Sequence, residues 1–326
     1  MFRKIMVPLD RSALAEQALG QAAAIARASH AGVDLILVHE PRALSEYQFG
    51  TADDEDLHGS ERYMQAVVAE LHSGASVEVT HAVVKGAPAE MIRARAHEVG
   101  ADLIVMTSHG RTGLSRAWLG SVADAVVRRS TIPVLMLRPV DTTPTDRLAA
   151  KHLFRCVLVP IDGSESARGI LDAAAALAQC GDATVVLLRV VPHVPKVIAY
   201  DMHEPLIFPP TIPDTEATEQ VVHEVTGQVE ELARSLRERG NVKVEAHVVV
   251  GDRVAESIID FARAHNADVI GMSTRGRGAS RILLGSVADK LLRASGLPML
   301  LRRPAEVGDT DSVDDDAAQL PAITSP

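Results

Sequence analysis

The sequence predicts an α/β fold of two tandem, doubly wound parallel-sheet domains of the Rossmann-like type. The first observation is that apolar segments such as IMVPL, DLILVH, LIVMTS and VLMLR are continuous runs rather than alternating patterns. Continuous runs are typical of strands buried on both faces of a parallel sheet. The second is that helical stretches of about 12 to 20 residues separate these strands, so that strand and helix alternate. The third is that the whole order of segments occurs twice in 326 residues, which is enough for two domains of about 150 residues each.

Taken in order, each half begins with a short strand that ends at Pro-x-Asp, with Asp10 in KIMVPLDRSALA and Asp162 in CVLVPIDGSESA. An alanine-rich helix follows, and then a second apolar strand, VDLILVHE or ATVVLLRVV. The third strand turns into the next helix at a glycine, Gly86 in VTHAVVKGAPAEMI and Gly251 in EAHVVVGDRVAESI. The fourth strand runs through a glycine-rich basic loop into a Gly-Ser pair that opens a helix, and LGSVAD is present in both copies. Each half ends in a strand, IPVLMLRP or LPMLLRRP, so we interpret the chain as a tandem duplication.

These repeats predict a first domain over 1–141, a linker over 142–152 and a second domain over 153–304. The second half is longer, mainly because of a proline-rich stretch at about 192–215 that is typical of a loop. Residues 216–240 carry an apolar stripe from Val221 to Leu236, which predicts a helix lying on the sheet, with a partner-binding helix as the alternative. Residues 305–326 hold six acidic residues and no Lys or Arg, and we predict a disordered acidic tail.

Bulk properties restrict the partners and the compartment. The formal net charge is −10, which does not favour nucleic acid or anionic lipid as a general partner. No apolar run approaches the roughly 20 residues of a membrane span, and the chain starts directly with a strand, so we expect a cytoplasmic protein without a signal peptide. Cys156 and Cys180 do not have disulfide or metal spacing and are expected to be buried or half-buried thiols. The histidines show no HExxH pattern, so no metal site is predicted.

The candidate site follows from where the strands end. In a parallel sheet a ligand binds beyond the carboxyl ends of the strands, and Asp10, Gly110, Asp162 and Gly276 all come directly after such ends. Glycines allow backbone N–H groups to approach an anion, and the start of a helix favours phosphate. The alternative is a tight turn in which Ser121 only caps its own helix, an alternative that the second copy of the motif makes less favourable.

Asp10 and Asp162 leave two interpretations open. A carboxylate at this position can accept hydrogen bonds from a ribose hydroxyl or an adenine amine. It can equally well be a cap or turn residue, and a cap would be duplicated along with everything else.

The combined motifs resemble the universal stress protein family. They are VPLD and VPID after the first strand, LVHE after the second, the glycine turn after the third, and Gly-x9-Gly-Ser after the fourth. The resemblance covers nearly the whole chain except the acidic tail and the 192–215 stretch. It implies two domains with a fold like that of the adenine nucleotide alpha hydrolases. It further implies that their last strands pair within one chain to give a pseudo-twofold unit, and it leaves a further homodimer open.

The resemblance also implies a ligand, ATP, with Mg²⁺ as its counter-ion. The pattern of the ATP-binding branch is G-x2-G-x9-G-S/T, and the chain departs from it in having Thr107 and Ser273 at the first glycine position and only eight residues between Gly276 and Gly285. Asp10 and Asp162 are expected to contact the adenosine part. The backbone near Glu40 and Val190, matching positions just after the second strand of each half, is expected to meet the adenine edge, beside the turns at Gly86 and Gly251. The expected phosphate-binding residues, including those that offer backbone N–H groups, are Gly110, Gly113, Gly120, Ser121 and Val122 in the first half and Gly276, Gly278, Gly285, Ser286 and Val287 in the second.

The expected function is binding and regulation rather than catalysis. The chain has no GxSxG elbow, no Walker A lysine after either glycine loop and no SGGxDS loop, so no catalytic residue is predicted. We expect an ATP-binding regulator of a stress or growth-arrest response. Two alternatives stay open: an interaction module whose pockets hold no nucleotide, with a protein partner that the sequence does not identify, and a weak ATPase that uses Asp10, Ser121 and their counterparts.

Overall fold

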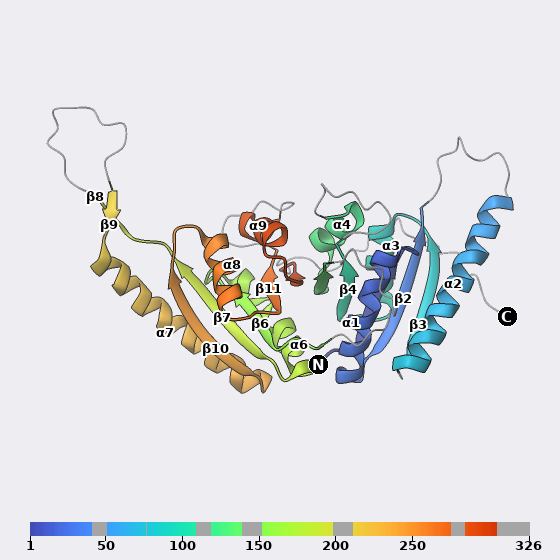
Figure 1. The fold of residues 1–326 in the computed structure, drawn as a ribbon, viewed down its shortest axis with the longest axis horizontal. Coiled ribbons are helices and arrows are strands. Elements are labelled where there is room, and N and C mark those ends of the chain that lie inside the picture. Colours follow the sequence, from blue (N-terminus) through green and yellow to red (C-terminus); the bar gives the residue numbers. More distant parts are fainter. Residues whose placement is uncertain are drawn as a thin grey trace, which may run out of the picture.

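The computed structural model describes residues 1–40, 51–75, 77–108, 119–138, 152–197, 211–274 and 284–304. Its centre is one ten-stranded sheet in the order β10-β7-β6-β11-β12-β5-β4-β1-β2-β3, shown in Figure 1. Each half contributes five strands in the same order, with crossovers on either side of its first strand, which confirms two doubly wound α/β units. The first half comprises β1 (Lys4–Leu9), α1 (Ala13–Ser29), β2 (Gly32–His39), α2 (Thr51–Ala75), β3 (Val79–Lys85), α3 (Pro88–Glu98), β4 (Leu103–Thr107), α4 (Ser121–Arg129) and β5 (Val134–Leu137).

The second half repeats this order with one insertion. Its elements are β6 (Cys156–Pro160), α5 (Glu165–Arg168), α6 (Leu171–Gly181), β7 (Thr184–Val191), β8 (Pro195–Val197), β9 (Thr211–Pro213), α7 (Thr215–Gly240), β10 (Lys243–Val250), α8 (Val254–Ala264), β11 (Val269–Ser273), α9 (Ser286–Ala294) and β12 (Met299–Arg302).

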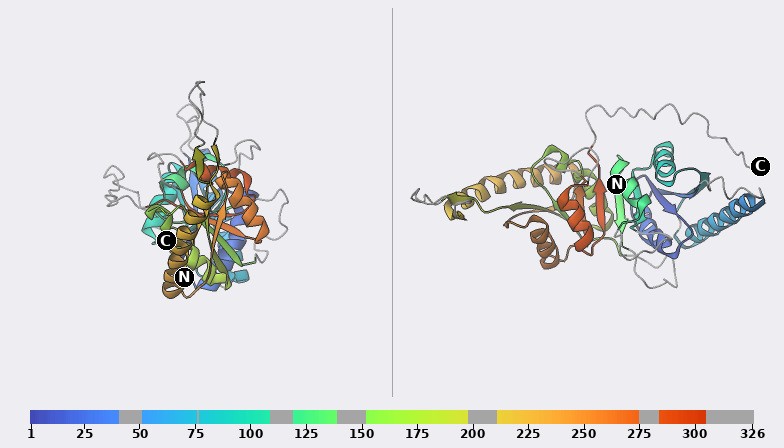
Figure 2. Two further views of the ribbon diagram at one scale, coloured as in Figure 1. Left: turned by 90° about the vertical axis from the view of Figure 1, so that its left-hand side faces the viewer. Right: turned by 90° about the horizontal axis from the view of Figure 1, so that it is seen from above.

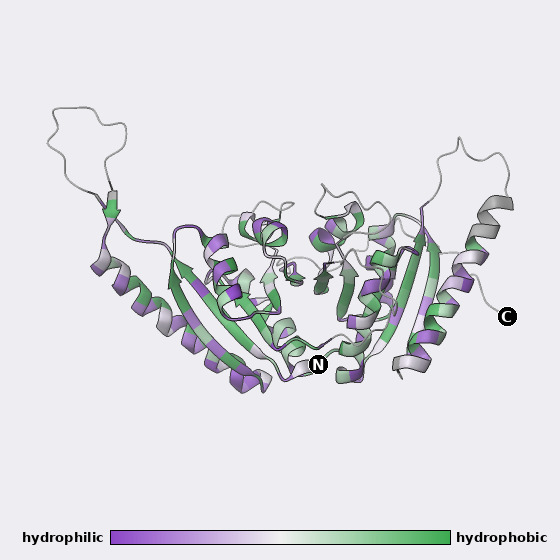
Figure 3. Cartoon of the chain, in the orientation of Figure 1, coloured by the Kyte–Doolittle hydropathy of each residue, from purple (hydrophilic) through white to green (hydrophobic). Residues whose placement is uncertain are grey.

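Helices cover both faces of the sheet, and each face has a core that runs through both halves. Residues of α1, α2, α6 and α7 form one core cluster with the strands, and residues of α3, α4, α8 and α9 form the other. The central strands are largely buried, as the continuous apolar runs predicted, and every residue of β4 and β11 is buried. Figure 3 shows the apolar strands between helices whose outward surfaces are polar. No helix among the described residues is both long and apolar enough to cross a membrane.

The two halves join through their last strands, which confirms the pairing expected from the sequence. β5 and β12 run antiparallel, with Met136 opposite Met299 and Leu135 opposite Leu300. All four side chains are 2% exposed or less, so the seam is part of the core. Figure 2 shows the two halves side by side in the view from above, with this seam in the middle. The two halves therefore share one sheet rather than forming separate bodies on a linker.

The alanine-rich helices pack closely on the sheet and on each other. Ser12 caps the start of α1, because its hydroxyl accepts from the N–H of Ala15 at 3.1 Å. Near the end of α1, Ser29 lies 3.1 Å from the sulfur of Cys180 on α6. Cys180 is buried and Cys156 half-buried, as expected, and both are free thiols.

Two local predictions differ from the structure. The alanine-rich helix of the second half is split into α5 and α6 around Gly169, where α1 continues through Gln17. Glycine in a helix interior is unfavourable, but it does not account for the break by itself, because α1 continues through Gly20. The 192–215 stretch is not wholly a loop, because β8 and β9 pair antiparallel across Lys196 and Ile212. Strands of three residues are too short to show the alternation of apolar and polar residues by which a strand is recognised in a sequence. The helix expected over 216–240 is confirmed as α7, which lies on the sheet through Val229 and Leu236.

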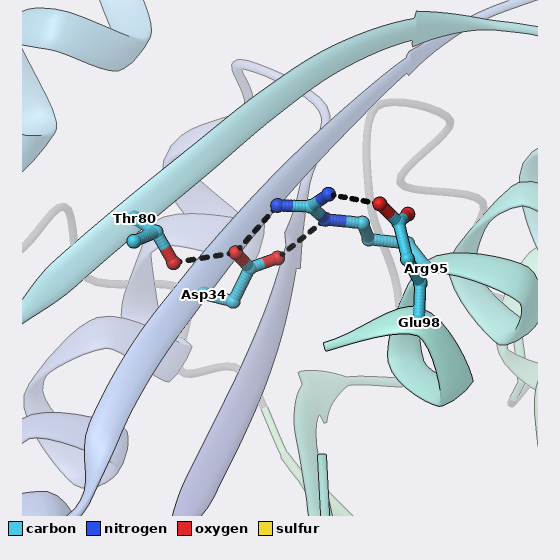
Figure 4. Close-up of polar contacts among 4 residues, drawn as sticks. All are labelled: Asp34, Thr80, Arg95 and Glu98. Carbon is cyan, nitrogen blue, oxygen red and sulfur yellow. Dashed lines mark hydrogen bonds and ion pairs between the residues drawn. The ribbon is translucent and has the colours of Figure 1, made fainter. Parts of the chain in front are cut away.

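A buried ion pair ties β2, β3 and α3 together in the first half (Figure 4). Asp34 is completely buried and accepts a hydrogen bond from Thr80 at 2.6 Å and two from Arg95, at 3.1 and 3.0 Å. Arg95 also donates to Glu98 at 3.1 Å. Hydrogen bonding to Asp34 and then the charges of Asp34 and Glu98 raise the pKa of Arg95, against the effect of burial. The second half has Val186 at the position of Asp34, so this tie belongs to the first half.

Candidate functional site

The carboxyl ends of the strands carry the first pair of predicted residues in a repeated turn. The Oδ1 of Asp10 accepts from the N–H of Ser12 at 2.9 Å, and the Oδ1 of Asp162 accepts from the N–H of Ser164 at 2.9 Å. In each turn the residue between the aspartate and the serine has a left-handed backbone conformation, with φ 65° at Arg11 and 77° at Gly163. The turn interpretation of the two aspartates is therefore realised. Each turn uses the Oδ1 atom of its aspartate. The turn by itself therefore does not decide whether the aspartate also contacts a ligand.

The start of the helix after the glycine loop is tied to the strand ends in the same way in both halves. Gly120 donates to the carbonyl of Ser108 at 2.7 Å, and Ser108 donates to that of Leu137 at 3.0 Å. In the second half Gly285 donates to Thr274 and Thr274 to Arg302, each at 2.9 Å. The Gly-Ser pairs thus lie at the same edge of the sheet as Asp10 and Asp162. Four predicted residues, Gly110, Gly113, Gly276 and Gly278, lie outside the described residues.

The two Gly-Ser helices begin without a side-chain cap. Gly120 and Gly285 are the N-cap residues, and within the described part of the chain no side chain caps either helix. Ser121 and Ser286 are the first helical residues and are exposed, so Ser121 is not the N-cap of its own helix. The first hydrogen bond inside α4 runs from Asp124 N–H to Gly120 at 2.9 Å. The N–H groups before it, including that of Val122, have no carbonyl within the helix to bind, as at every helix start; Val287 is the equivalent in α9.

The backbone of these two glycines does not require glycine. Gly120 has φ −64° and ψ 151°, and Gly285 has φ −58° and ψ 145°. Any residue adopts these angles, and Ser, Asp or Asn would stabilise the helix start better than glycine does. What glycine provides here is the lack of a side chain in front of the first-turn N–H groups. Both halves have this feature.

Acidic residues near the helix starts are neutralised by arginines one turn later. Asp124 lies 2.7 Å from Arg128, and Asp289 lies 2.9 Å from Arg293. A carboxylate in the first turn would otherwise repel an anion at the same helix end. Hydrogen bonding to Asp124 is the main cause that raises the pKa of Arg128, and the charge of Asp289 on α9 adds to it.

Thr107 and Ser273 stand where the family pattern has its first glycine. They are the last residues of β4 and β11, and they are 6% and 7% exposed. Each is paired in register with the neighbouring strand, to Leu137 and Arg302. Both departures from the pattern are thus buried residues of the sheet.

Gly86 and Gly251 make the same contact but differ in conformation. Each donates its N–H at 2.9 Å to the end of the second strand of its half, at His39 and Val191. Gly86 has φ 151°, and a Cβ there would lie 2.8 Å from Met91. Gly251 lacks the positive φ, and a Cβ there would collide with the flexible side chain of Ser257. Only the first of the two needs glycine for its backbone.

The prediction that Val190 matches Glu40 and follows the second strand is wrong. Pro8 pairs with Ile36 and Pro160 with Leu188, so equivalent positions in the second strands differ by 152. Val190 lies inside β7 and is 9% exposed, whereas Glu40 follows β2. The equivalent of Glu40 is Pro192, which has no N–H to donate. Matching the two strands by residue type shifted the alignment by two positions, and only the register reveals it.

Two contacts at the carboxyl ends of the strands in the second half were not predicted from the sequence. Arg189 occupies the position of Leu37 and donates to the carbonyl of Ile161, beside Asp162, at 3.2 Å. His193 binds the carboxylate of Asp252 with both its N–H and its ring Nδ1, each at 3.0 Å. The two hydrogen bonds from His193, the backbone one first, lower the pKa of Asp252. A basic residue within an apolar strand was the available signal for Arg189; nothing local indicated the second contact.

Among the described residues, no cluster of three or more His, Cys, Asp or Glu could hold a metal ion. In each half, the carboxyl ends of the strands thus carry a turn with an aspartate, a glycine-capped helix start and a glycine turn. Backbone N–H groups dominate this arrangement, and such groups suit an anionic ligand.

Comparison with known proteins identifies the family of the chain. The family model described as the universal stress protein family matches residues 1–138 and 153–303, while the finer limits at 141 and 153–304 stay predictions. A universal stress protein of Mycobacterium tuberculosis is 31% identical over 203 residues, which are 62% of this chain and 62% of that protein. The match thus spans less than two thirds of such curated relatives.

Solved structures show the same fold over almost the whole chain. A universal stress protein from Archaeoglobus fulgidus is 21% identical, with a TM-score of 0.63 over 93% of this chain and 98% of its own. A putative universal stress protein from Pseudomonas aeruginosa is 20% identical, with a TM-score of 0.57 over 93% and 94%. These likenesses concern the fold alone. With two matches of the family model that together span most of its length, the chain belongs to the universal stress protein family.

Proposed function

We propose that the protein binds adenine nucleotide, with ATP and Mg²⁺ as the expected ligand, at one site in each half, and that occupancy regulates a stress or growth-arrest response in the cytoplasm. Family membership supports the stress-response role. The observation that carries the binding proposal is the repeated glycine cap of α4 and α9. A side chain at either glycine would obstruct the N–H groups of the first helical turn.

A helix start without a side-chain cap has N–H groups that need an external partner. In both halves the residue in front of these groups is a glycine whose backbone angles would accept any residue. An anion such as a phosphate is stabilised at this position by the N–H groups and by the helix dipole. The nearby first-turn acids are already paired with Arg128 and Arg293. The proposal therefore assigns the phosphates to Gly120–Ser121 and Gly285–Ser286 and the nucleoside to the side of Asp10 and Asp162.

A second candidate applies to the second half. Pro192 stands where the first half has Glu40, and Arg189 stands where it has Leu37. The hairpin of β8 and β9 begins next to these positions, held by the contact between His193 and Asp252. These differences favour a second site that takes a different ligand or serves a protein partner, as in the interaction-module interpretation.

The test is calorimetric titration of the full chain with Mg-ATP, in parallel with Gly120→Val and Gly285→Val. Both substitutions suit the local backbone, so far-ultraviolet circular dichroism should be unchanged. Each is expected to abolish one binding event. Gly227→Val is the matched control, because an added Cβ at this position in α7 meets nothing within 4 Å in the described part of the chain. Unchanged ATP affinity in the first two variants would contradict the site assignment.

A release assay for inorganic phosphate separates regulation from turnover. We expect no steady release above that of the Gly120→Val/Gly285→Val double variant. Sustained release that both substitutions abolish would instead support the weak ATPase.

A further inference from the structure

The helix that opens the second site is held by a residue of the first half. Arg138 follows β5 directly, and its guanidinium donates to the carbonyl of Leu292 near the end of α9. The sequence separation of 154 residues makes this a contact across the seam. It is independent of the pairing of β5 with β12, which involves only backbone groups.

The carbonyl that Arg138 binds is one that the helix itself leaves without a partner. α9 ends at Ala294, so Leu292 belongs to the last turn, where carbonyls lack an N–H within the helix. A cation at this end also offsets the negative end of the helix dipole. Arg138 is exposed as a whole residue, and the partial burial of its side chain lowers its pKa. Fixing the end of a short helix fixes its axis and hence its first turn.

The first turn of α9 is the proposed phosphate site of the second half. α9 has nine residues, and at about 1.5 Å per residue the two ends are only about 13 Å apart. A tilt at the Leu292 end therefore displaces the N–H groups after Gly285. The charge of Asp289 in the first turn of α9 also contributes to the raised pKa of Arg128, on α4 of the first half.

The position of Arg138 also connects it to the first site. Leu137, the residue before it, accepts the hydrogen bond from Ser108, which in turn accepts from Gly120. The strand end that supports the helix start of the first half thus carries the side chain that supports α9 of the second half.

We infer that Arg138 is a positioning residue for the nucleotide site of the other half: it holds α9 across the seam, so the second site is complete only when the first half is present. This inference rests on the proposed function. It makes a prediction that a purely structural role would not, because Arg138 belongs to the first half and its loss should act at the second site.

The experiment compares the two sites separately in the full chain. Gly120→Val leaves only the second site, and Gly285→Val leaves only the first. Arg138→Met is added to each, and Mg-ATP binding is measured by calorimetry. At the second site we expect the dissociation constant to rise about fivefold, the lower end of couplings between separate sites. At the first site it should not change beyond the error of the titration.

Two further variants exclude a general loss of stability. Arg138→Lys keeps a charged donor and is expected to restore part of the second-site affinity. Arg239→Met is the matched control, since Arg239 is exposed in the last turn of α7, a helix that opens neither site, and should change neither site. Thermal unfolding of every variant shows that it is folded.

Equal losses at both sites, or an unchanged second site, would overturn the inference and leave the proposed function intact. A Gly120→Val protein that binds no ATP while Gly285→Val does would also overturn it. A wild-type chain that binds no ATP at all would overturn the proposed function together with this inference.

Discussion

Replacing Asp34 by alanine should destabilise the first half strongly, although Asp34 lies away from the proposed site. The carboxylate is completely buried and accepts hydrogen bonds from Thr80 and, in two places, from Arg95. Removing it takes away the buried partner of the Arg95 guanidinium, which is largely covered by the protein. Breaking a buried pair in this way typically costs about 3 to 5 kcal/mol.

The structure indicates that the loss of stability lies at the lower end of this range. Arg95 is 22% exposed and keeps its contact with Glu98 at 3.1 Å, so its charge retains one partner. We therefore expect the free energy of unfolding to fall by about 3 kcal/mol. The second half suggests a compensating change, since it has Val186 where the first has Asp34. The double variant Asp34→Val/Arg95→Leu should recover to within about 1 kcal/mol of the wild type, because apolar replacement of a whole buried pair is often neutral.

The assay is urea unfolding followed by circular dichroism, together with hydrogen exchange of β2, β3 and α3. Exchange in Asp34→Ala should increase in these elements more than in their counterparts β7, β10 and α8. A loss below about 1 kcal/mol for Asp34→Ala, or a double variant as unstable as the single one, would refute the reasoning.

Three further predictions concern groups elsewhere in the chain. Burial, with smaller effects of Asp268 and Glu245, raises the pKa of Cys156 to about 11, so iodoacetamide at pH 8 should label it rapidly only after unfolding; fast labelling of the native protein would contradict this. Asp252 has a pKa below its ordinary 3.8, so its contribution to the base of the β8–β9 hairpin is present above about pH 4 and is lost as the pH falls through the lowered pKa. The difference in hydrogen exchange at His193 between the wild type and Asp252→Asn should therefore be present at pH 6 and shrink as the pH falls below 3.8 through the lowered pKa of Asp252, and a difference that stays constant over this acid range would argue against the carboxylate. Leu300→Ala at the seam should cost about 2 to 5 kcal/mol and loosen both halves in hydrogen exchange; an effect limited to one half would show that they do not share a core.

Much of the fold could be predicted because its signals are local. Continuous apolar runs identified the buried strands, and the repeated LGSVAD identified the helix starts and the duplication. The pairing of IPVLMLRP with LPMLLRRP followed from the family resemblance, and the register of β5 and β12 confirms it. The break at Gly169 and the hairpin of β8 and β9 were missed, because one turn or three residues carry too little periodicity.

The contacts that distinguish the two halves could not be predicted, because each depends on tertiary geometry. Arg95 lies 61 residues from Asp34 in the sequence, and Arg138 lies 154 from Leu292. Both arginines look like ordinary charged surface residues in the sequence. The shift that misplaced Val190 has the same origin, because hydrogen-bond register, and not residue similarity, aligns the second strands. The glycine caps could be located from the sequence, but only their backbone angles show that glycine is dispensable for conformation there.

The most direct test of two adenine-nucleotide sites is the nucleotide content of the protein after saturation. The full chain would be saturated with Mg-ATP, freed of unbound ligand, denatured, and analysed by chromatography for nucleotide per chain. We predict two per chain for the wild type and one for each of Gly120→Val and Gly285→Val. A wild-type chain that releases no nucleotide, and shows no heat on titration with Mg-ATP, would contradict the account and favour an interaction module without a nucleotide.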